Sequence, residues 1–521
     1  MSRPGESVRG QHAAARKQRF AVLAGQSERS ILLGAVLLLT AASAALSYFL
    51  TQLFAVDIVS SLLNTPEDCW LDWQMNIGRH CFSDYGMVVT AGLQANPFDY
   101  EMSLPFGNYE PLRTGGPAAA MLPHLLFGFP AQLLGMPRLG LIGYVLALTI
   151  AVLAPAIWAA RGSRGLERVV VFVALGAAAV PVWAVIDRGN SAGFIVPVAL
   201  VFFIALRREK WLLAAVMVVL ASIVKPWFVI LVVAIFAARQ WRSGIIALGG
   251  VAVVHIAAYL LWPRDFPGTI PESIKNLSDI GSSFQDLISL RNVSFGRGLV
   301  LLPDTLSFLQ TGGKMPDGFL IGPRSLFGYL ILVVVVVAVL ALGKRIPPVM
   351  AGIVLLATAT LSPPLAYYYY LVFVLPIAAL IVRDPNGPAG AGIFDGLSRD
   401  GNSRRAVGFW LSMATALSIA QIAIPAIVVN APIFGQFGER GQIGSTPVEF
   451  LTSVIFVPFL WLIACAAILI SYARKPVHPT GFGDEATPEP LQEDAVATPA
   501  GHPERTTDLT RGTEPRAGGL E

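Results

Sequence analysis

The sequence predicts an all-α polytopic membrane protein. Hydrophobic residues make up 55% of the 521 residues and charged residues only 13%, whereas about one quarter of a soluble globular chain is charged. Apolar runs recur along most of the chain, and each is long enough or nearly long enough to cross about 30 Å of hydrocarbon. Because backbone groups in lipid must be satisfied within their own segment, we expect these runs to be helices rather than barrel strands.

The first apolar run, residues 31–54, is expected to leave the cytoplasm. Arg16, Lys17, Arg19 and Arg29 precede it, and Lys and Arg concentrate on the cytoplasmic side of membrane helices. The run is too long for a signal-peptide core and lacks a convincing cleavage site, so we expect a retained anchor. The net charge is +4, but the basic residues lie at loop positions that orient helices. No nucleic-acid partner is expected.

The alternation of basic loops gives about twelve transmembrane helices, with nearly every basic cluster on the cytoplasmic side. We do not count the apolar run at 117–134, because Pro123 and Pro130 are expected to break it. A full crossing there would also place the later basic clusters outside, so we expect an interfacial or re-entrant helix. The predicted crossings are residues 31–54, 138–159, 169–186, 191–206, 211–224, 227–238, 243–262, 325–342, 347–362, 367–382, 407–429 and 447–472.

Three parts of the chain are expected. Residues 1–30 form a basic cytoplasmic N-terminus, and residues 31–472 form a transmembrane domain with long outer loops at 55–137 and 263–324. Residues 473–521 are rich in Pro, Glu, Thr and Gly and contain few apolar residues. Such a segment cannot bury a core, so we expect a disordered cytoplasmic tail.

The three cysteines have different expected roles. Cys69 and Cys81 both lie in the first outer loop. In an oxidising compartment they could form a disulfide that stabilises the loop by roughly 3 kcal/mol, and two free thiols are the alternative. Cys465 lies within an apolar run, where we expect it to pack as a buried residue.

The predicted topology brings polar side chains from distant parts of the chain to one outer face. Charged groups near a membrane are costly and usually functional. Acids and bases that meet at one membrane surface indicate a site for an amphiphilic, anionic substrate. The residues are Arg79, His80, Asp84, Arg113, Asp187, Arg188, Asn190, Lys225, Arg264, Asp265 and Tyr367 to Tyr370.

Two cations in this set are candidate phosphate ligands. Lys225 precedes Pro226, which ends a helix. Its ammonium either binds a phosphate or extends to the lipid headgroups at the helix end. Arg188 lies in the turn Asp187-Arg188-Gly189-Asn190. It could hold a phosphate through two hydrogen bonds, or it could pair with Asp187 in a tight turn.

Asp84 is the candidate general base, because a carboxylate beside a phosphate ester could take a proton from an attacking hydroxyl. The sequence alone favours the plainer interpretation, a solvated acid in a loop. His80, His124 and His255 are weaker candidates for substrate contact.

The run Tyr367 to Tyr370 is explained by an aromatic belt at the membrane interface. One or two of these rings could instead stack on the face of a sugar.

Three stretches carry a resemblance to a known family. The first joins Ser83-Asp84-Tyr85, Asn96-Pro97-Phe98-Asp99 and Asn108-Tyr109-Glu110-Pro111; the second joins Arg188-Gly189-Asn190 and Ser222-Ile223-Val224-Lys225-Pro226; the third joins Leu361-Ser362-Pro363 to tyrosines and Leu371-Val372-Phe373-Val374-Leu375-Pro376. Together, over residues 31–382, they resemble the GT-C superfamily of integral-membrane glycosyltransferases. More narrowly, they look like glycosyltransferase family 87, the polyprenol-phosphate-mannose-dependent mannosyltransferases and relatives.

The resemblance implies a GT-C-like fold in the cell membrane, with the active site on the extracytoplasmic face. It also implies transfer of mannose or another sugar, such as a pentose, from a polyprenyl-phosphate donor to a cell-envelope glycan or glycolipid. The family's loop acid falls on Asp84. A single base and a phosphate leaving group predict inversion. No cofactor is expected, and no metal is required, because Lys and Arg can neutralise a monophosphate; a metal-dependent scheme stays open from the sequence. The expected substrate-binding residues are Lys225, Arg188, Asn190, His80, Arg113, Tyr367, Tyr368, Tyr369 and His255.

Two other functions remain open from the sequence. A transporter or flippase of a lipid-linked saccharide would show internal repeats and charges near mid-bilayer, and a polar path to the cytoplasmic side would favour it. A non-catalytic membrane scaffold would have an outer pocket with no acid near a basic phosphate site.

Overall fold

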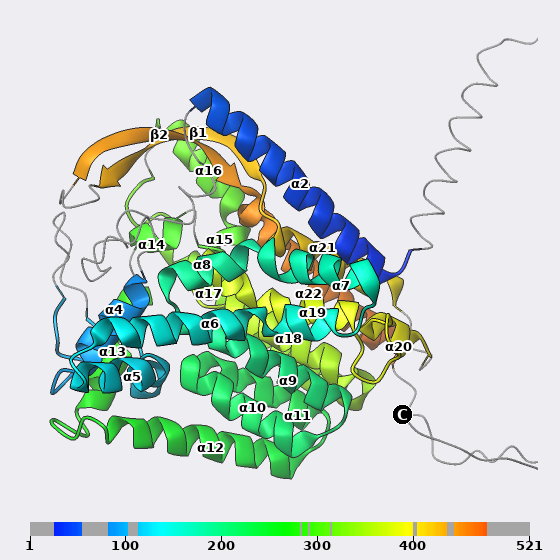
Figure 1. Ribbon diagram of the computed structural model, residues 1–521, viewed down its shortest axis with the longest axis horizontal. Coiled ribbons are helices and arrows are strands. Elements are labelled where there is room, and N and C mark those ends of the chain that lie inside the picture. Colours follow the sequence, from blue (N-terminus) through cyan, green and yellow to red (C-terminus); the bar gives the residue numbers. More distant parts are fainter. Residues whose placement is uncertain are drawn as a thin grey trace, which may run out of the picture. The chain divides into compact units, whose positions relative to one another are not determined.

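The computed structural model describes residues 26–54, 82–102, 113–281, 284–289, 292–312, 315–399, 404–434 and 442–476. The predicted helical membrane-protein class is confirmed for this part of the chain (Figure 1). Some expectations fall on residues outside it. They are the Cys69–Cys81 pair, Arg79, His80, the stretch Asn108-Tyr109-Glu110-Pro111, the N-terminal segment 1–25 and nearly all of the expected tail.

Helices in the first half of the chain overlap the predicted apolar runs. At Pro226 the chain forms a tighter 3₁₀ turn before the helix continues. The elements are α2 (Glu28–Phe54), α4 (Ser83–Gly92), α5 (Ala118–Leu133), α6 (Pro137–Ala160), α7 (Gly165–Phe172), the π-helical turn η2 (Val173–Ala177), α8 (Val180–Arg188), η3 (Ser191–Phe194), α9 (Ile195–Arg207), α10 (Trp211–Val224), η4 (Pro226–Leu231), α11 (Val232–Ala237) and α12 (Trp241–Tyr259).

The second half begins with short helices in the second predicted outer loop and then returns to apolar helices. These elements are α13 (Thr269–Gly281), α14 (Phe284–Ile288), α15 (Phe295–Leu299), α16 (Leu301–Gln310), α17 (Ile321–Leu342), η5 (Gly343–Arg345), α18 (Pro348–Leu361), η6 (Tyr368–Phe373), α19 (Val374–Val382), α20 (Ile393–Arg399), α21 (Arg405–Ile419), β1 (Ala423–Phe434), β2 (Gln442–Thr452), η7 (Ser453–Phe456) and α22 (Val457–Arg474).

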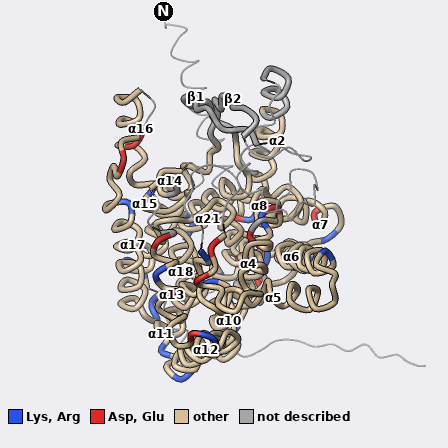
Figure 2. Tube along the Cα trace, turned by 90° about the vertical axis from the view of Figure 1, so that its left-hand side faces the viewer, with Lys and Arg blue, Asp and Glu red and all other residues tan. Residues whose placement is uncertain are grey.

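Five described helices are long and apolar enough to cross a membrane. A sixth is counted if the α7–η2 and α8 pair, which bends by 43°, acts as one span. Other apolar helices have only 10–17 residues. Long stretches of the trace carry no charged residue (Figure 2). The chain is a multi-pass membrane protein, and the count of about twelve crossings stays a prediction.

Helix α5 differs from its predicted form. The expectation that Pro123 and Pro130 break this run is wrong, because both prolines lie inside one continuous helix of 16 residues. A proline removes one backbone donor, and helices packed among other apolar helices tolerate that loss. Helix α5 packs against α4, α6, α10 and α12, and it carries the buried His124 into this contact.

The predicted crossings 407–429 and 447–472 differ from the structure where they approach each other. Helix α21 ends at Ile419, and the chain then forms the antiparallel pair β1–β2, with Val429 opposite Val448. The sequence of β1 contains Pro425 and a run of β-branched residues. Proline disfavours a continuing helix and β-branched residues favour an extended chain. This hairpin is an addition to the predicted all-α fold.

Helices α9, α10 and α19 each connect the same two ends of the helical bundle. Asn190 and Lys225 lie at one end, beside the start of α9 and the end of α10. Arg207 and Asp384 lie at the other, at the end of α9 and just after α19. A helix of 13 residues such as α9 separates the two ends by roughly 20 Å. We refer to these as the Asp84 end and the basic end.

The basic end consists of residues 161–168, 207–210 and 383–399. The backbone N–H of Gly390 donates to Gly162 O at 2.9 Å, and Arg208 Nη2 donates to Pro385 O at 2.7 Å. Segments that the alternation of loops assigned to one side of the membrane are therefore in direct contact.

Candidate active site

The backbone brings the start of α4 against the end of α8. The N–H of Phe82 donates to the carbonyl of Asp187 at 2.9 Å. Asp84 lies in the first turn of α4, where the helix dipole favours a negative charge. Arg188 is the last residue of α8, so this one backbone contact places the acid and the guanidinium side by side.

Gly189 allows both of its neighbours to face Asp84. It caps α8 in the left-handed conformation, with φ 62°, which glycine adopts without the steric cost that other residues have. A Cβ at this position would lie 3.3 Å from Tyr85 Cβ and 3.4 Å from Phe82 Cα. The turn is therefore packed closely against the residues on either side of Asp84.

Asp84 is held by three side-chain hydrogen bonds. Arg188 donates from Nη2 to Oδ1 at 2.9 Å and from Nε to Oδ2 at 3.2 Å. Asn190 donates from Nδ2 to Oδ2 at 2.6 Å, and its own Oδ1 accepts from the N–H of Ala192. The Asp84 and Arg188 side chains are each 12% exposed. The acid is thus ordered and nearly buried, which excludes the interpretation as a solvated loop acid.

Lys225 completes the charged group. Residues before proline avoid the helical conformation, and Lys225 is extended, with φ −143° and ψ 115°, directly before Pro226. Its ammonium lies over the rings of Tyr370 at 5.4 Å and Trp227 at 5.7 Å. Such cation–π contacts hold a cation without neutralising its charge.

The pKa of Asp84 reflects these neighbours. Burial alone favours the neutral carboxyl and would raise its pKa. The charge and hydrogen bond of Arg188, the hydrogen bond of Asn190 and the charge of Lys225 oppose burial, and the pKa lies below its usual value of 3.8. The carboxylate is therefore ionised at neutral pH, and Lys225 is within electrostatic reach of it.

The tyrosine run contributes three of its four rings to the site. The Arg188 guanidinium lies 5.0 Å from the ring centre of Tyr369 and 5.7 Å from that of Tyr367, while Tyr370 contacts Lys225. Tyr368 packs edge-on against Tyr369. The rings thus contact both candidate phosphate-binding cations, which an aromatic belt would not require.

Asn292 ties the tyrosine segment to the second predicted outer loop. Its Nδ2 donates to Pro364 O at 2.8 Å and to Leu287 O at 3.1 Å, and its Oδ1 accepts from the N–H of Ala366 at 3.1 Å. The N–H of Val293 also donates to Ala366 O at 2.7 Å. Asn292 is 4% exposed. One buried amide therefore sets the position of the chain just before Tyr367.

A buried ion cluster fixes the helices that follow Asn292. Asp304 in α16 accepts from Arg297 Nη1 in α15 at 2.6 Å and from Arg324 Nη1 in α17 at 2.8 Å. All three side chains are at most 10% exposed. The segment around Asn292, which contacts the chain just before Tyr367, is thereby attached to α17.

Other residues of the predicted site lie elsewhere. Arg113 is at the surface, where it pairs with Glu101 at 2.6 Å and with Asp99 at 3.7 Å. His255 in α12 lies 3.1 Å from the carbonyl of Ser222, so it contacts the helix that ends at Lys225. His80 is outside the described residues.

The structure places His124, a weaker candidate for substrate contact, in an aromatic layer that the sequence did not indicate. His124 stacks on Tyr144 at 5.1 Å, and Tyr144 contacts Tyr85 at 4.7 Å. Tyr144 also donates from its hydroxyl to Gly189 O at 2.9 Å. The layer supports the turn that carries Arg188 and Asn190. Periodicity could not reveal it, because each ring lies on a different helix.

Residues 117–363 match the model of glycosyltransferase family 87. The match indicates a glycosyltransferase. The resemblance expected from the sequence is confirmed, and the matched region contains Arg188, Asn190 and Lys225. Asp84 and the tyrosine run lie outside it, so their place in the candidate site depends on the contacts described above. A comparison with curated proteins found no match.

Proposed function

We propose that the protein transfers a sugar from a polyprenyl-phosphate donor to a cell-envelope glycan or glycolipid on the extracytoplasmic face of the membrane. One observation carries this proposal. Asp84 is bound by Arg188 and lies within electrostatic reach of Lys225 at one end of an apolar helical bundle. A lipid-linked phosphate needs cations for its headgroup and apolar surroundings for its tail.

In the proposed reaction these groups have complementary roles. Lys225 and Arg188 bind the donor phosphate and stabilise the charge that develops on it as it leaves. Asp84 accepts the proton of the acceptor hydroxyl. The acceptor oxygen forms a bond to the anomeric carbon while the bond between that carbon and the phosphate oxygen breaks. Polyprenyl phosphate departs, and attack from the opposite face inverts the configuration.

The Asp84–Arg188 ion pair has to change during this reaction. With its charge balanced by Arg188, Asp84 is a weak base, because its pKa is lowered. A donor phosphate offers Arg188 a second partner with matching two-point geometry. We infer that donor binding draws Arg188 from Asp84, which raises the pKa of the carboxyl and prepares it to take a proton.

The helices between the two ends of the bundle favour transfer over transport. Between Ile195 and Leu206, Trp211 and Val224, and Val374 and Val382 the sequence contains no charged residue. A transporter of a lipid-linked saccharide would need a polar path through this region.

The test uses membranes that contain Asp84→Asn or the matched control Asp99→Asn, supplied with labelled polyprenyl-phosphate sugar. Asp99 is an exposed acid in the same predicted outer loop. We expect transfer to fall by roughly 10²–10⁴-fold in Asp84→Asn and to stay at the wild-type rate in the control. Donor binding to Asp84→Asn, measured separately, should persist because both cations remain. Wild-type transfer by Asp84→Asn would eliminate the assignment of the base.

A further inference from the structure

The described residues line an open cavity of about 440 Å³ at the basic end, away from Asp84. Its lining contains three guanidinium groups against two carboxylates, together with an amide and a glycine. The lining residues are Arg207, Arg208, Glu209, Asp384, Asn386, Gly396 and Arg399. We propose that this cavity binds the phosphate group of an anionic ligand, and that a membrane phospholipid supplies it.

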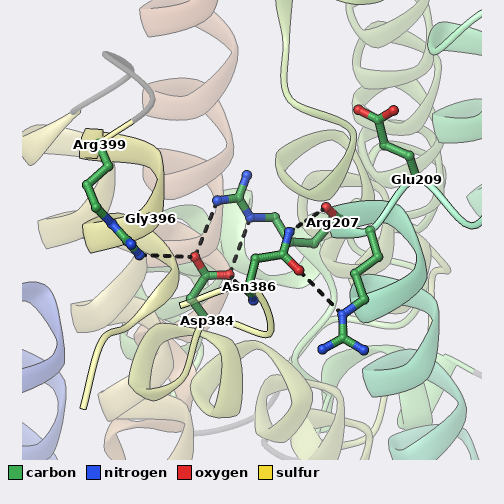
Figure 3. A pocket seen from close by; sticks show the side chains of 7 residues that line it. Arg207, Glu209, Asp384, Asn386, Gly396 and Arg399 are labelled. Carbon is green, nitrogen blue, oxygen red and sulfur yellow. Dashed lines mark hydrogen bonds and ion pairs between the residues drawn. The ribbon is translucent and has the colours of Figure 1, made fainter. Parts of the chain in front are cut away.

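The buried carboxylate of Asp384 and its arginine partners form the floor of the cavity. Asp384 is 1% exposed and accepts from Nε and Nη2 of Arg207, both at 3.3 Å (Figure 3). Arg399 approaches the same carboxylate at 3.9 Å. A Cβ on Gly396 would collide with Asp384 Oδ2 and would lie 2.8 Å from Arg207 Nη2. Glycine therefore allows α20 to approach the ion pair closely.

The contacts between Asp384 and these guanidinium groups are longer than strong charge-assisted hydrogen bonds. Charge-assisted N–H···O bonds are usually about 2.7–2.9 Å long, and the contacts to Asp384 are all longer than this. At the Asp84 site, by contrast, the two contacts of Arg188 with its carboxylate are shorter, at 2.9 Å and 3.2 Å. The second carboxylate, Glu209, is turned away from Asp384 (Figure 3). Arg399, whose contact with this carboxylate is the longest and whose side chain is 55% exposed, thus retains capacity for another anion.

Neighbouring arginines increase the positive charge around the cavity. The pKa of the Arg383 guanidinium lies below its usual value, first because of burial and then because Arg208 and Arg161 repel its charge. Arg208 itself is bound only to neutral oxygens among its described partners, Pro385 O at 2.7 Å and Asn386 Oδ1 at 3.3 Å. Planar guanidinium groups match the oxygens of a phosphate in geometry as well as charge.

The position of the cavity favours a lipid phosphate over a soluble one. It lies where the apolar helices α9 and α19 end and α10 begins. Leu212, Val216 and Leu220 of α10 follow Glu209 at helical spacing and are 60%, 43% and 40% exposed. An acyl chain could lie along this stripe while its phosphate enters the cavity. Basic pockets beside transmembrane helices bind anionic headgroups in this way.

The experiment measures thermal stabilisation of the full-length chain in neutral detergent. The ligands are phosphatidylglycerol, phosphatidylcholine as the neutral lipid, and glycerol phosphate as the soluble probe. The cavity variant combines Arg208→Gln with Arg399→Gln and leaves the part-buried Arg207–Asp384 pair intact. The control combines Arg242→Gln with Arg345→Gln, which removes the same charge from two exposed residues outside the cavity lining.

We expect phosphatidylglycerol to stabilise the wild type and the control at similar concentrations, and the cavity variant to need at least roughly tenfold more. If glycerol phosphate also stabilises the chain in a cavity-dependent manner, the phosphate site stands and its ligand is soluble. Equal responses of the cavity variant and the control to both anionic ligands would overturn the proposal. Arg399→Gln alone serves if the double variant does not fold, because the Arg399 side chain is 55% exposed.

Discussion

Arg188 and Asp84, which lie 104 residues apart in the chain, form a two-point ion pair. Nη2 contacts Oδ1 at 2.9 Å and Nε contacts Oδ2 at 3.2 Å. The planar fork of a guanidinium is required for this geometry, and an ammonium cannot reproduce it. The same fork would be presented to a phosphate when the pair opens. The pair is therefore the element of the site on which the proposed reaction depends most.

Arg188→Lys should lose transfer although it keeps the charge. We expect a fall of roughly 10²-fold or more, the usual effect of removing a donor that stabilises developing charge. The measurement is the rate of sugar transfer from labelled polyprenyl-phosphate sugar. Arg113→Lys is the matched control, because Arg113 forms an exposed ion pair with Glu101, and it should transfer normally. Equal rates in the two variants would contradict the role of the fork.

Gly189→Ala should reduce transfer by displacing Arg188 and Asn190. A left-handed conformation costs a residue with a Cβ about 1–2 kcal/mol, and the new methyl would also press on Phe82 and Tyr85. Gly135→Ala is the control, since Gly135 has φ 67° and no atom near an added Cβ. We expect both variants to unfold at lower temperature, and only Gly189→Ala to lose transfer beyond that effect. Similar transfer rates would exclude a special role for this turn.

Asn292→Ala should reduce transfer, although Asn292 is not one of the proposed catalytic or phosphate-binding residues. The change leaves the carbonyls of Pro364 and Leu287 without this donor, which costs about 1–3 kcal/mol, and it frees the tyrosine segment. We expect a roughly tenfold loss of transfer, mainly as a higher KM for the donor, because Tyr367, Tyr369 and Tyr370 position Arg188 and Lys225.

The control for Asn292 is another buried asparagine. Asn276 donates to the carbonyls of Phe98 at 2.8 Å and Thr114 at 3.3 Å, so Asn276→Ala removes a comparable tether. It should lower thermal stability to a similar extent and leave KM unchanged. A merely structural role for Asn292 would give the two variants the same kinetics.

The lowered pKa of Asp84 predicts how stability depends on pH. Because the folded-state pKa lies below the usual 3.8, the ion pair stabilises the fold at any pH above about 4. This stabilisation is lost only as the pH falls further, through the folded-state pKa. The difference in unfolding temperature between wild type and Asp84→Asn should therefore stay constant from pH 8 to pH 5. A difference that shrinks between pH 7 and pH 5 would show that Asp84 titrates in that range.

Much of the helical layout could be predicted, because apolar runs mark the helices and basic loops mark their ends within short stretches of sequence. Lys225 before Pro226 marked the end of α10, and Gly189 marked the end of α8. The convergence of Arg188, Asn190 and Lys225 followed from the alternation of basic loops alone. The β1–β2 hairpin was missed because its apolar composition outweighed Pro425, the residue that argued against a continuing helix.

The rest depends on contacts between residues far apart in the chain. Asn292 acts on Pro364, 72 residues later, and Arg207 pairs with Asp384 at a separation of 177 residues. Neither asparagine nor aspartate at such positions has a local pattern that indicates its partner. The roles of Tyr367, Tyr369 and Tyr370 also needed the structure, because a run of four tyrosines does not show which rings face the cations.

A structure of the chain with polyprenyl phosphate bound would test the central claim most directly. The account predicts that the phosphate lies between Arg188 and Lys225, with oxygens at about 2.7–3.2 Å from both side chains, and that Arg188 has moved from Asp84. A phosphate bound away from both cations, with the Asp84–Arg188 pair unchanged, would contradict it.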